Sequence, residues 1–336
     1  MLQGVLVTLC STAANTTEGG NVGRERVVVA IGGNSLIADP KRQTLEDQFA
    51  AARETDHHIG GLVAQGLDVT VVHGNGPQVG FILLRSELAR GELHEVPLDV
   101  CVADTQGAIG YTLQQTLAED LAQRGIDRGV VTVVTQVEVD PDDPAFTHPT
   151  KPIGSFMTAE EAAERRAAEG WDVVEDANRG WRRVVASPRP QRIVELDAIR
   201  HLLEGGFVVI SVGGGGIPVA RNAAGELRGV AAVIDKDHAA AMLAGEIGAT
   251  RLIISTAVDR VALDFGTDRQ RPVDHLSLDE ARAYLAEGTH FAPGSMAPKI
   301  EAVIDFLEAG GKEAIITTPQ LLEMAVAGEA GTRITH

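Results

Sequence analysis

The chain has little of several residue types that mark other classes of protein. It contains only two cysteines, Cys10 and Cys101, which lie far apart and form no CxxC pair. This excludes a disulfide framework and a cysteine-based metal site, and it favours a reducing, cytoplasmic compartment. No apolar run approaches the roughly 18 residues that indicate a membrane span. We therefore expect a soluble protein.

Basic residues are also scarce. Lysine and arginine together number 29, against 47 acidic residues, so the formal net charge is -18. Such a charge disfavours nucleic acid and anionic membranes as partners, because both rely on basic patches for most of their affinity. A small anionic substrate remains compatible with the sequence, since a few local cations can outweigh the overall field.

Lysine is the rarer of the two cations, with five copies against 24 arginines. Three of the five, Lys151 in PTKPIG, Lys236 in IDKDH and Lys299 in APGSMAPKIEA, lie where loops lead into helices. A chain that otherwise uses arginine indicates that these positions need a compact ammonium group. Lys299 follows Pro298, which suits the first helical position, and a cation beside that positive helix end costs stability unless an anion binds there. The alternative is an ordinary solvent-exposed lysine.

Short β-branched runs alternate with amphipathic helical segments from Arg26 onward. RVVVAI, DVTVV, FVVISV, RLIIST and EAIITT are the clearest strand signals. Because this alternation specifies crossover connections, it predicts a three-layer α/β/α sandwich with a mostly parallel central sheet. The capping-box spacing of Thr44 and Asp47 predicts a helix from about Thr44 to Gly66, and another is expected between Asp104 and Gly125.

Two segments depart from this rhythm. Residues 1–24 are expected to form a flexible tail, because they lack the positive start of a signal peptide. Residues 140–192 concentrate proline, arginine and both tryptophans, and they contain a helix capped by Thr158 and Glu161. We interpret this segment as a subdomain that protrudes from the sheet, either a lid or a structural hairpin.

Three glycine turns follow predicted strands: Gly32, Gly33 and Asn34; Gly74, Asn75 and Gly76; and Gly213, Gly214, Gly215 and Gly216. Ligands of parallel sheets bind at the carboxyl ends of strands, where glycine allows close approach to the backbone. None of the turns matches GxxxxGK[ST] or GxGxxG, so neither a P-loop nor a dinucleotide fingerprint is present. Each turn on its own is also explained as a tight turn, but together they indicate phosphate binding by another arrangement.

Asp237 follows Lys236 at the start of a predicted helix. It is either the N-cap of that helix or a carboxylate that holds ammonium groups toward phosphate oxygens. His57 and His58 are adjacent in a helix and point in different directions, so a shared metal is not expected. His73 could orient the Gly74 turn or contact a ligand. No Ser/His/Asp or Cys/His pattern indicates nucleophilic or acid–base catalysis.

Long stretches of the chain resemble carbamate kinases, within the amino-acid kinase superfamily. They are VVVAIGGNSL, VVHGNGPQVG, PLDVCVADTQGAIGY, DPAFTHPTKPIGSF, DANRGWRRVVASPRP, GGGGIPV, GVAAVIDKDHA and HFAPGSMAPKIEA, in this order from about Arg26 to the C-terminus. The resemblance implies a homodimer whose N-terminal lobe, residues 25–230, binds carbamate or carbamoyl phosphate. It implies that residues 231–336 form the lobe that binds ATP or ADP with Mg²⁺.

The resemblance also implies roles for individual residues. Lys236 and Lys299 would neutralise phosphates, Asp237 would organise the lysines, and Lys151 would reach in from the protruding subdomain. Gly32, Gly33 and Asn34 would contact the transferring phosphoryl group, with Gly74, Asn75 and Gly76 on the substrate side, and Gly213, Gly214 and Gly215 would bind substrate or phosphate. Nucleotide contacts would come from Ala257, Asp259, Pro293 and Met296; the metal ligands are unknown.

The implied reaction is reversible phosphoryl transfer between ATP and carbamate, run toward ATP synthesis in arginine or purine catabolism. Carbamate is already an anionic nucleophile and needs no general base, which agrees with the missing acid–base pattern. Two alternatives stay open at this point. One is a related acid kinase with another substrate, and the other is a non-catalytic sensor of nucleotide or carbamoyl phosphate.

Overall fold

The computed structural model of the chain describes residues 23–32, 44–175, 180–292 and 294–336. Its main sheet has eight strands in the order β15, β17, β16, β12, β1, β2, β9 and β3. Their bounds are β15 His275–Ser277, β17 Thr332–Thr335, β16 Glu313–Thr317, β12 Arg251–Ser255, β1 Arg26–Ile31, β2 Asp68–His73, β9 Val208–Ile210 and β3 Val130–Thr132. From β16 to β3 every pairing is parallel, and the exception within the sheet is the antiparallel β16–β17 pair.

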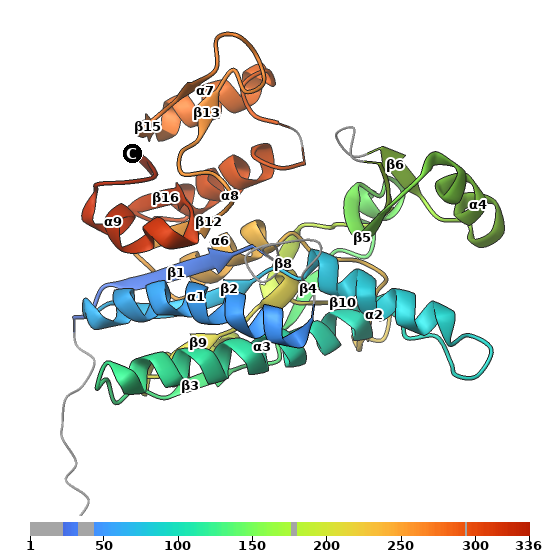
Figure 1. The fold of residues 1–336 in the computed structure, drawn as a ribbon, viewed down its shortest axis with the longest axis horizontal. Helices are drawn as coiled ribbons and strands as arrows, with labels where there is room; N and C mark the ends of the chain where they lie inside the picture. Colours follow the sequence, from blue (N-terminus) through green and yellow to red (C-terminus); the bar gives the residue numbers. More distant parts are fainter. Residues whose placement is uncertain (1–22, 33–43, 176–179, 293) are drawn as a thin grey trace, which may run out of the picture.

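Helices cover both faces of this sheet (Figure 1). They are α1 Leu45–Ala64, α2 Gly76–Leu88, α3 Leu98–Gln123, α4 Ala159–Glu169, α5 Leu196–Glu204, α6 Lys236–Glu246, α7 Leu278–Glu287, α8 Ala297–Glu308 and α9 Leu322–Ala327, with short 3₁₀ turns η2 Pro144–Phe146, η3 Gly213–Gly215 and η4 Pro319–Leu321. Successive residues of β1 point to opposite faces, so Val27 and Val29 share one core with α1, α3 and α9. Val28 and Ala30 share the other with α5, α6 and α8. The predicted three-layer sandwich is confirmed.

The predicted helix boundaries were right at the capping boxes and wrong where proline begins a helix. Thr44 caps α1 and Thr158 caps α4, each with the reciprocal bond from its third helical residue. By contrast, α3 begins at Leu98, well before Asp104, because Pro97 supplies an extended N-cap. Leu98, Cys101 and Val102 already bury the apolar face of α3, and this helical spacing was the missed signal.

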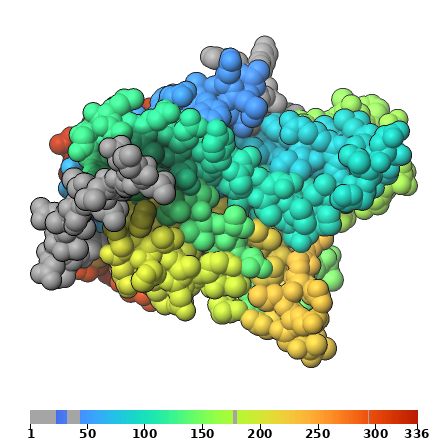
Figure 2. Space-filling view, turned by 90° about the horizontal axis from the view of Figure 1, so that it is seen from below, coloured from blue at the N-terminus to red at the C-terminus, as the bar shows by residue number. Residues whose placement is uncertain are grey.

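Residues from β5 to β7 form a projecting unit outside the main sheet. It consists of β5 Lys151–Met157, α4, β6 Val173–Glu175 and β7 Trp181–Val185, and its three strands pair antiparallel in the order β5, β7, β6. Figure 1 shows this unit standing away from the sheet at one end of the molecule. In Figure 2 it lies beside the cyan residues at the end of α2. Whether it acts as a lid stays a prediction.

Two smaller sheets complete the described chain. The strands β11 Leu227–Gly229, β10 Ile217–Arg221, β4 Gln136–Val139 and β8 Pro190–Ile193 form one, and β13 Ala262–Leu263 with β14 Arg271–Pro272 form the other. The main sheet runs without interruption through strands from both halves of the chain, so the division into lobes at residue 230 stays a functional prediction. Among the described residues, no helix is both long and apolar enough to cross a membrane.

A buried carboxyl group between α1 and α3 provides a stability test. Asp56 is 1% exposed; Thr116 donates a hydrogen bond to its Oδ2, while its Oδ1 has no partner. Burial raises the pKa of Asp56 well above its usual value, against the bond from Thr116. Because the folded state then holds the proton more tightly than the unfolded chain, this group destabilises the fold as pH rises above the unfolded pKa of about 4.

We expect Asp56→Asn to stabilise the protein above that pH, because a neutral amide keeps the Thr116 bond without burying a charge. Near pH 8 the free energy of unfolding should rise by about 1–3 kcal/mol, and the gain should shrink toward pH 4. Denaturant unfolding at several pH values measures it, with the exposed Asp127→Asn as control. A variant that is less stable at every pH would contradict the argument.

Candidate active site

The segment from Asp235 to Asp237 forms the start of α6. Asp235 is the N-cap, and its Oδ1 accepts a hydrogen bond of 2.9 Å from the backbone N–H of Asp237. The sequence-based option that Asp237 is the N-cap is therefore wrong. Since Asp235 has already satisfied the helix end, the Asp237 side chain is left to bind other groups.

Three lysines that are distant in sequence meet at this segment. The Asp237 carboxylate accepts hydrogen bonds from Lys236, at 2.9 Å to Oδ1, and from Lys299 of α8, at 2.8 Å to Oδ2. Lys151, the first residue of β5, donates to Oδ2 of Asp235 at 2.5 Å. The sequence reasoning grouped the lysines around one aspartate and missed Asp235; the paired acids of the Asp-Lys-Asp tripeptide were the available signal.

Burial and charge oppose each other within this lysine cluster (Lys151, Lys236 and Lys299). Burial alone would raise the pKa of Asp237, but the ammonium groups of Lys236 and Lys299 outweigh it and hold that pKa far below its usual range. Burial lowers the pKa of Lys236. Burial also acts to lower the pKa of Lys299, but the charge and hydrogen bond of Asp237 together with the charge of Asp235 outweigh it and raise that pKa. Three ammonium groups against two carboxylates leave one local positive charge inside an acidic protein. Such a site attracts an anion.

The loop Gly213–Gly216 packs between the glycine turn after β2 and the segment that carries the lysine cluster. A side chain at Gly213 would place its Cβ 2.2 Å from Nε2 of His73, and one at Gly214 would lie 2.3 Å from Nδ2 of Asn75. At Gly215 it would lie 2.4 Å from the carbonyl oxygen of Ile234, beside Asp235. Close packing thus explains these glycines without any ligand, and contact with phosphate stays a prediction for Gly213, Gly214 and Gly215.

Gln106 of α3 holds this loop in place, and the sequence reasoning missed it. Its amide nitrogen donates to the carbonyl oxygens of Gly213, at 2.8 Å, and Thr135, at 3.0 Å, while its Oε1 accepts from the Thr135 N–H at 2.8 Å. The Thr135 hydroxyl in turn accepts from the backbone N–H of Val212, a residue with a φ of 54°. A buried glutamine within ADTQGAIG was the available signal.

His73 lies at the end of β2 and is 1% exposed. Its Nδ1 donates to the carbonyl oxygen of Gly74 at 3.1 Å. Burial lowers the pKa of His73 to about 4, against the hydrogen bond to Gly74 and with a smaller contribution from the charge of Lys236. The ring is therefore neutral at physiological pH, and its visible role is to orient the Gly74 turn, one of the two options that the sequence left open.

The other predicted positions are more scattered. Gly32 and Gly74 follow the paired ends of β1 and β2, Asn75 donates to the Thr105 hydroxyl at 2.9 Å, and Gly76 begins α2. Ala257 and Asp259 are exposed in the loop after β12, and Met296 is the N-cap of α8, which begins at Ala297, one residue earlier than expected. Gly33, Asn34 and Pro293 lie outside the described residues. Of the two helix histidines, His57 contacts Asp120 and His58 contacts Glu323.

The described residues contain no group of three or more histidine, cysteine, aspartate or glutamate side chains that could hold a metal ion. They do offer buried hydroxyl groups without partners at strand ends on the carboxyl edge of the sheet. Ser255 ends β12, Thr317 ends β16, and Ser211 follows β9. The edge that carries the glycine turns is therefore rich in polar atoms that a ligand could satisfy.

Comparisons with known proteins place the chain among kinases. Residues 25–318 match the amino acid kinase family. The chain is 52% identical to the carbamate kinase-like protein YahI of Escherichia coli, over 93% of this chain and 99% of that relative. It is 47% identical to a carbamate kinase of Clostridium perfringens, over 92% of this chain and 99% of the relative. The solved structure of a Giardia lamblia carbamate kinase bound to AMP-PNP superposes with a TM-score of 0.85 at 40% identity, covering 93% of this chain and 98% of that one.

Proposed function

The chain belongs to the amino acid kinase family, and we propose that within it the protein is a carbamate kinase, which transfers a phosphoryl group reversibly between ATP and carbamate. The observation that carries the proposal is the meeting of Lys151, Lys236 and Lys299 on the segment from Asp235 to Asp237. Relatives named carbamate kinase, similar over almost their whole length, supply the substrate.

In this reaction the bond between the γ-phosphorus and the oxygen bridging to the β-phosphate breaks, and that oxygen leaves with the electron pair as part of ADP. A carbamate oxygen forms the new bond to phosphorus. Since carbamate is already an anion, no proton has to be removed. This agrees with His73, whose lowered pKa and bond to Gly74 leave it no evident role as a base.

The protein's contribution is then positioning and charge compensation. We assign Lys236 and Lys299 to the phosphate oxygens and Lys151 to the transferring group, with Asp237 and Asp235 holding the three ammonium groups in place. Gly32 at the end of β1, with its neighbours Gly33 and Asn34, would contact the transferring phosphoryl group. The turn from Gly74 to Gly76 would hold carbamate, and Gly213, Gly214 and Gly215 would line the same edge.

We propose that the nucleotide binds on the side of β12 and α8. Along the sequence, Ala257 and Asp259 follow β12, and Pro293 and Met296 precede α8, the helix that carries Lys299. Residues 25–230 would then serve the carbamate side and residues 231–336 the nucleotide side, with the reaction run toward ATP synthesis because carbamoyl phosphate is a high-energy anhydride.

A metal ion that accompanies the nucleotide would have to be held mainly by atoms other than the carboxylates of the lysine cluster. Asp235 and Asp237, the carboxylates of the site, are already bound to lysines. We propose Mg²⁺ held by phosphate oxygens and water, as is usual for this ion, with no cage of protein ligands. When bound, it would neutralise part of the phosphate charge.

The homodimer also stays a proposal. The strand β3 is at the end of the main sheet among the described residues. The neighbouring α3 carries Tyr111, which is 61% exposed, and Val134 after β3 is 56% exposed. An open strand edge beside exposed apolar side chains is a surface that a second copy could cover.

A substrate panel tests the function. With ADP, carbamoyl phosphate should yield ATP with a kcat/KM at least about 100-fold higher than acetyl phosphate or N-acetylglutamyl phosphate, because a site that binds the carbamoyl amide discriminates against donors lacking it. The readout is ATP coupled to NADPH formation. Faster turnover of another acyl phosphate would identify a different acid kinase. Binding of ADP without turnover of any donor would identify a sensor.

A further inference from the structure

The projecting unit contacts α2 through two glycines, Gly80 and Gly154, whose backbones lie directly against each other. A Cβ at Gly80 of α2 would lie 2.1 Å from Cα and 2.5 Å from N of Gly154 in β5, distances that no real Cβ tolerates. Gly154 is three residues from Lys151 in the same strand. Next to this contact, Val79 of α2 and Ile153 of β5 are buried in one apolar cluster, at 0% and 1% exposure.

Gly154 also marks an irregularity in β5. The strand pairs with β7 from Lys151 to Ile153, and the register then shifts before Met157. Gly154 has a φ of 70°, and its carbonyl oxygen accepts a hydrogen bond of 3.1 Å from Arg182 of β7. The part of β5 that bears Lys151 therefore packs directly on α2, and the strand bends immediately after the Gly80–Gly154 contact.

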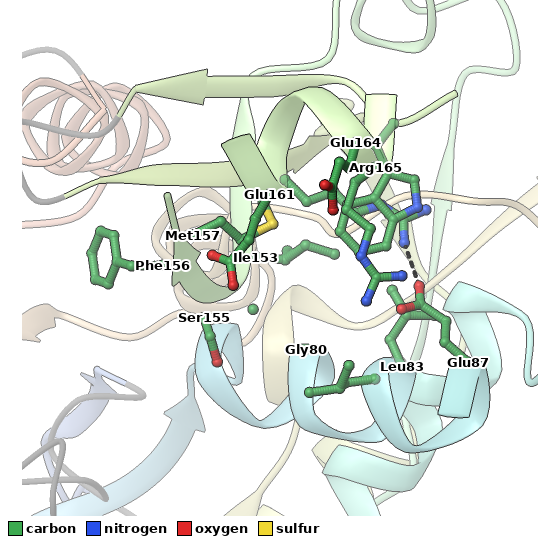
Figure 3. A pocket seen from close by; sticks show the side chains of 14 residues that line it. Gly80, Leu83, Glu87, Ile153, Ser155, Phe156, Met157, Glu161, Glu164 and Arg165 are labelled. Atoms are coloured by element: carbon green, nitrogen blue, oxygen red, sulfur yellow. Dashed lines mark hydrogen bonds and ion pairs between the residues drawn. The ribbon is translucent and has the colours of Figure 1, made fainter. Parts of the chain in front are cut away.

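Beyond the Gly80–Gly154 contact, α2 and the projecting unit separate. A cavity of about 390 Å³ lies between α2 and the projecting unit, lined by Leu83 on one side and by Met157 and Glu161 on the other. Figure 3 shows these side chains facing the space from opposite elements. The next link is the hydrogen bond of 3.1 Å from Arg183 of β7 to Glu87 of α2. The unit is thus held at separate points along α2, with open space between them.

We propose that the Gly80–Gly154 contact is the pivot that sets the reach of Lys151 to Asp235, and that Gly80 is a positioning residue for the transferring phosphoryl group. The inference rests on the proposed function only for the role of Lys151. A larger residue at position 80 must push β5 away by about 1 Å or more, while Lys151 is bonded to Asp235 at 2.5 Å. A displacement of that size can cost about 100-fold in rate.

The test is Gly80→Ala, measured first without catalysis. Acetic anhydride labels exposed amines, and peptide mass spectrometry reads each lysine separately. We expect labelling of Lys151 to rise at least about threefold as its bond to Asp235 loosens, with labelling of Lys236 and Lys299 unchanged. This result does not depend on the substrate, so it separates failure of the pivot from failure of the proposed function. Unchanged labelling of Lys151 would overturn the pivot.

The kinetic readout is a double-mutant cycle. Gly80→Ala should lower kcat about 10–100-fold with little change in the KM for ADP, and it should have no further effect on a Lys151→Ala protein. If the kcat losses of the two single variants multiply in the double variant, Gly80 acts on general stability and not through Lys151, and the proposal is overturned. Gly107→Ala on the exposed face of α3, where a Cβ meets nothing within 4 Å, is the matched control for the added methyl group. It should leave kcat and Lys151 labelling unchanged.

If Gly80→Ala does not fold, Glu87→Gln tests the same pivot from the second link. Weakening the bond to Arg183 should free the projecting unit to rotate about the Gly80–Gly154 contact, so labelling of Lys151 should rise and kcat should fall. Wild-type labelling in Glu87→Gln would count against the pivot.

Discussion

Replacing Lys151 by alanine is expected to lower kcat for ATP synthesis by about 100–1000-fold, the usual cost of losing one preorganised charge that acts on the transition state. The Kd for ADP should change less than about threefold, because interactions used only in the transition state contribute little to ground-state binding. Lys151 comes from the projecting unit and is bonded to Asp235, so its removal leaves the Lys236–Asp237–Lys299 arrangement intact.

The measurement pairs steady-state kinetics with calorimetric titration of ADP. Lys312→Ala is the matched control, because Lys312 is exposed before β16 and has no part in the lysine cluster; its kcat should equal that of the wild type. Lys151→Arg tests whether a compact ammonium is needed, and it should recover only part of the lost rate. If kcat and ADP affinity fall by the same factor, Lys151 serves binding and the catalytic assignment fails.

Asp237→Asn should be the most damaging single change to the fold of the site. The side chain of Asp237 is 4% exposed and holds two ammonium groups, so its neutralisation leaves two largely buried cations without their nearest counter-charge. Breaking a buried ion pair in this way costs about 3–5 kcal/mol. For a chain of 336 residues that is a fall in Tm of about 4–7 °C. Activity should fall by at least about 100-fold, because both lysines lose their anchor.

The pH dependence of this effect has a definite sign. The folded-state pKa of Asp237 lies far below the unfolded value of about 3.9, so its stabilisation is fully present above about pH 4 and is lost as the pH falls through the folded pKa. The difference in Tm between wild type and Asp237→Asn should therefore be constant above that pH and should decrease as the pH falls below it. Asp197→Asn, at a fully exposed side chain, is the control. A gap that widens in acid would contradict the role given to Asp237.

Local sequence signals predicted the fold well because each depends on neighbours along the chain. Alternating β-branched runs and helices fixed the three layers, and the capping boxes at Thr44 and Thr158 fixed two helix starts. The start of α3 at Leu98 was missed because proline replaced the polar cap that the prediction relied on. The same limit applied to the Asp-Lys-Asp tripeptide, where composition alone did not decide which aspartate capped the helix.

By itself the sequence determined which chemistry this protein carries, since scarce lysines placed in glycine- and proline-rich junctions already indicated charge compensation for phosphate. The tertiary structure decided which groups meet. It brought Lys151 to Asp235 across 84 positions, packed His73 against Gly213, and seated β5 on Gly80. Such contacts depend on crossover connections and on backbone separations of a few ångström, and neither is written in the spacing of residues along a single chain.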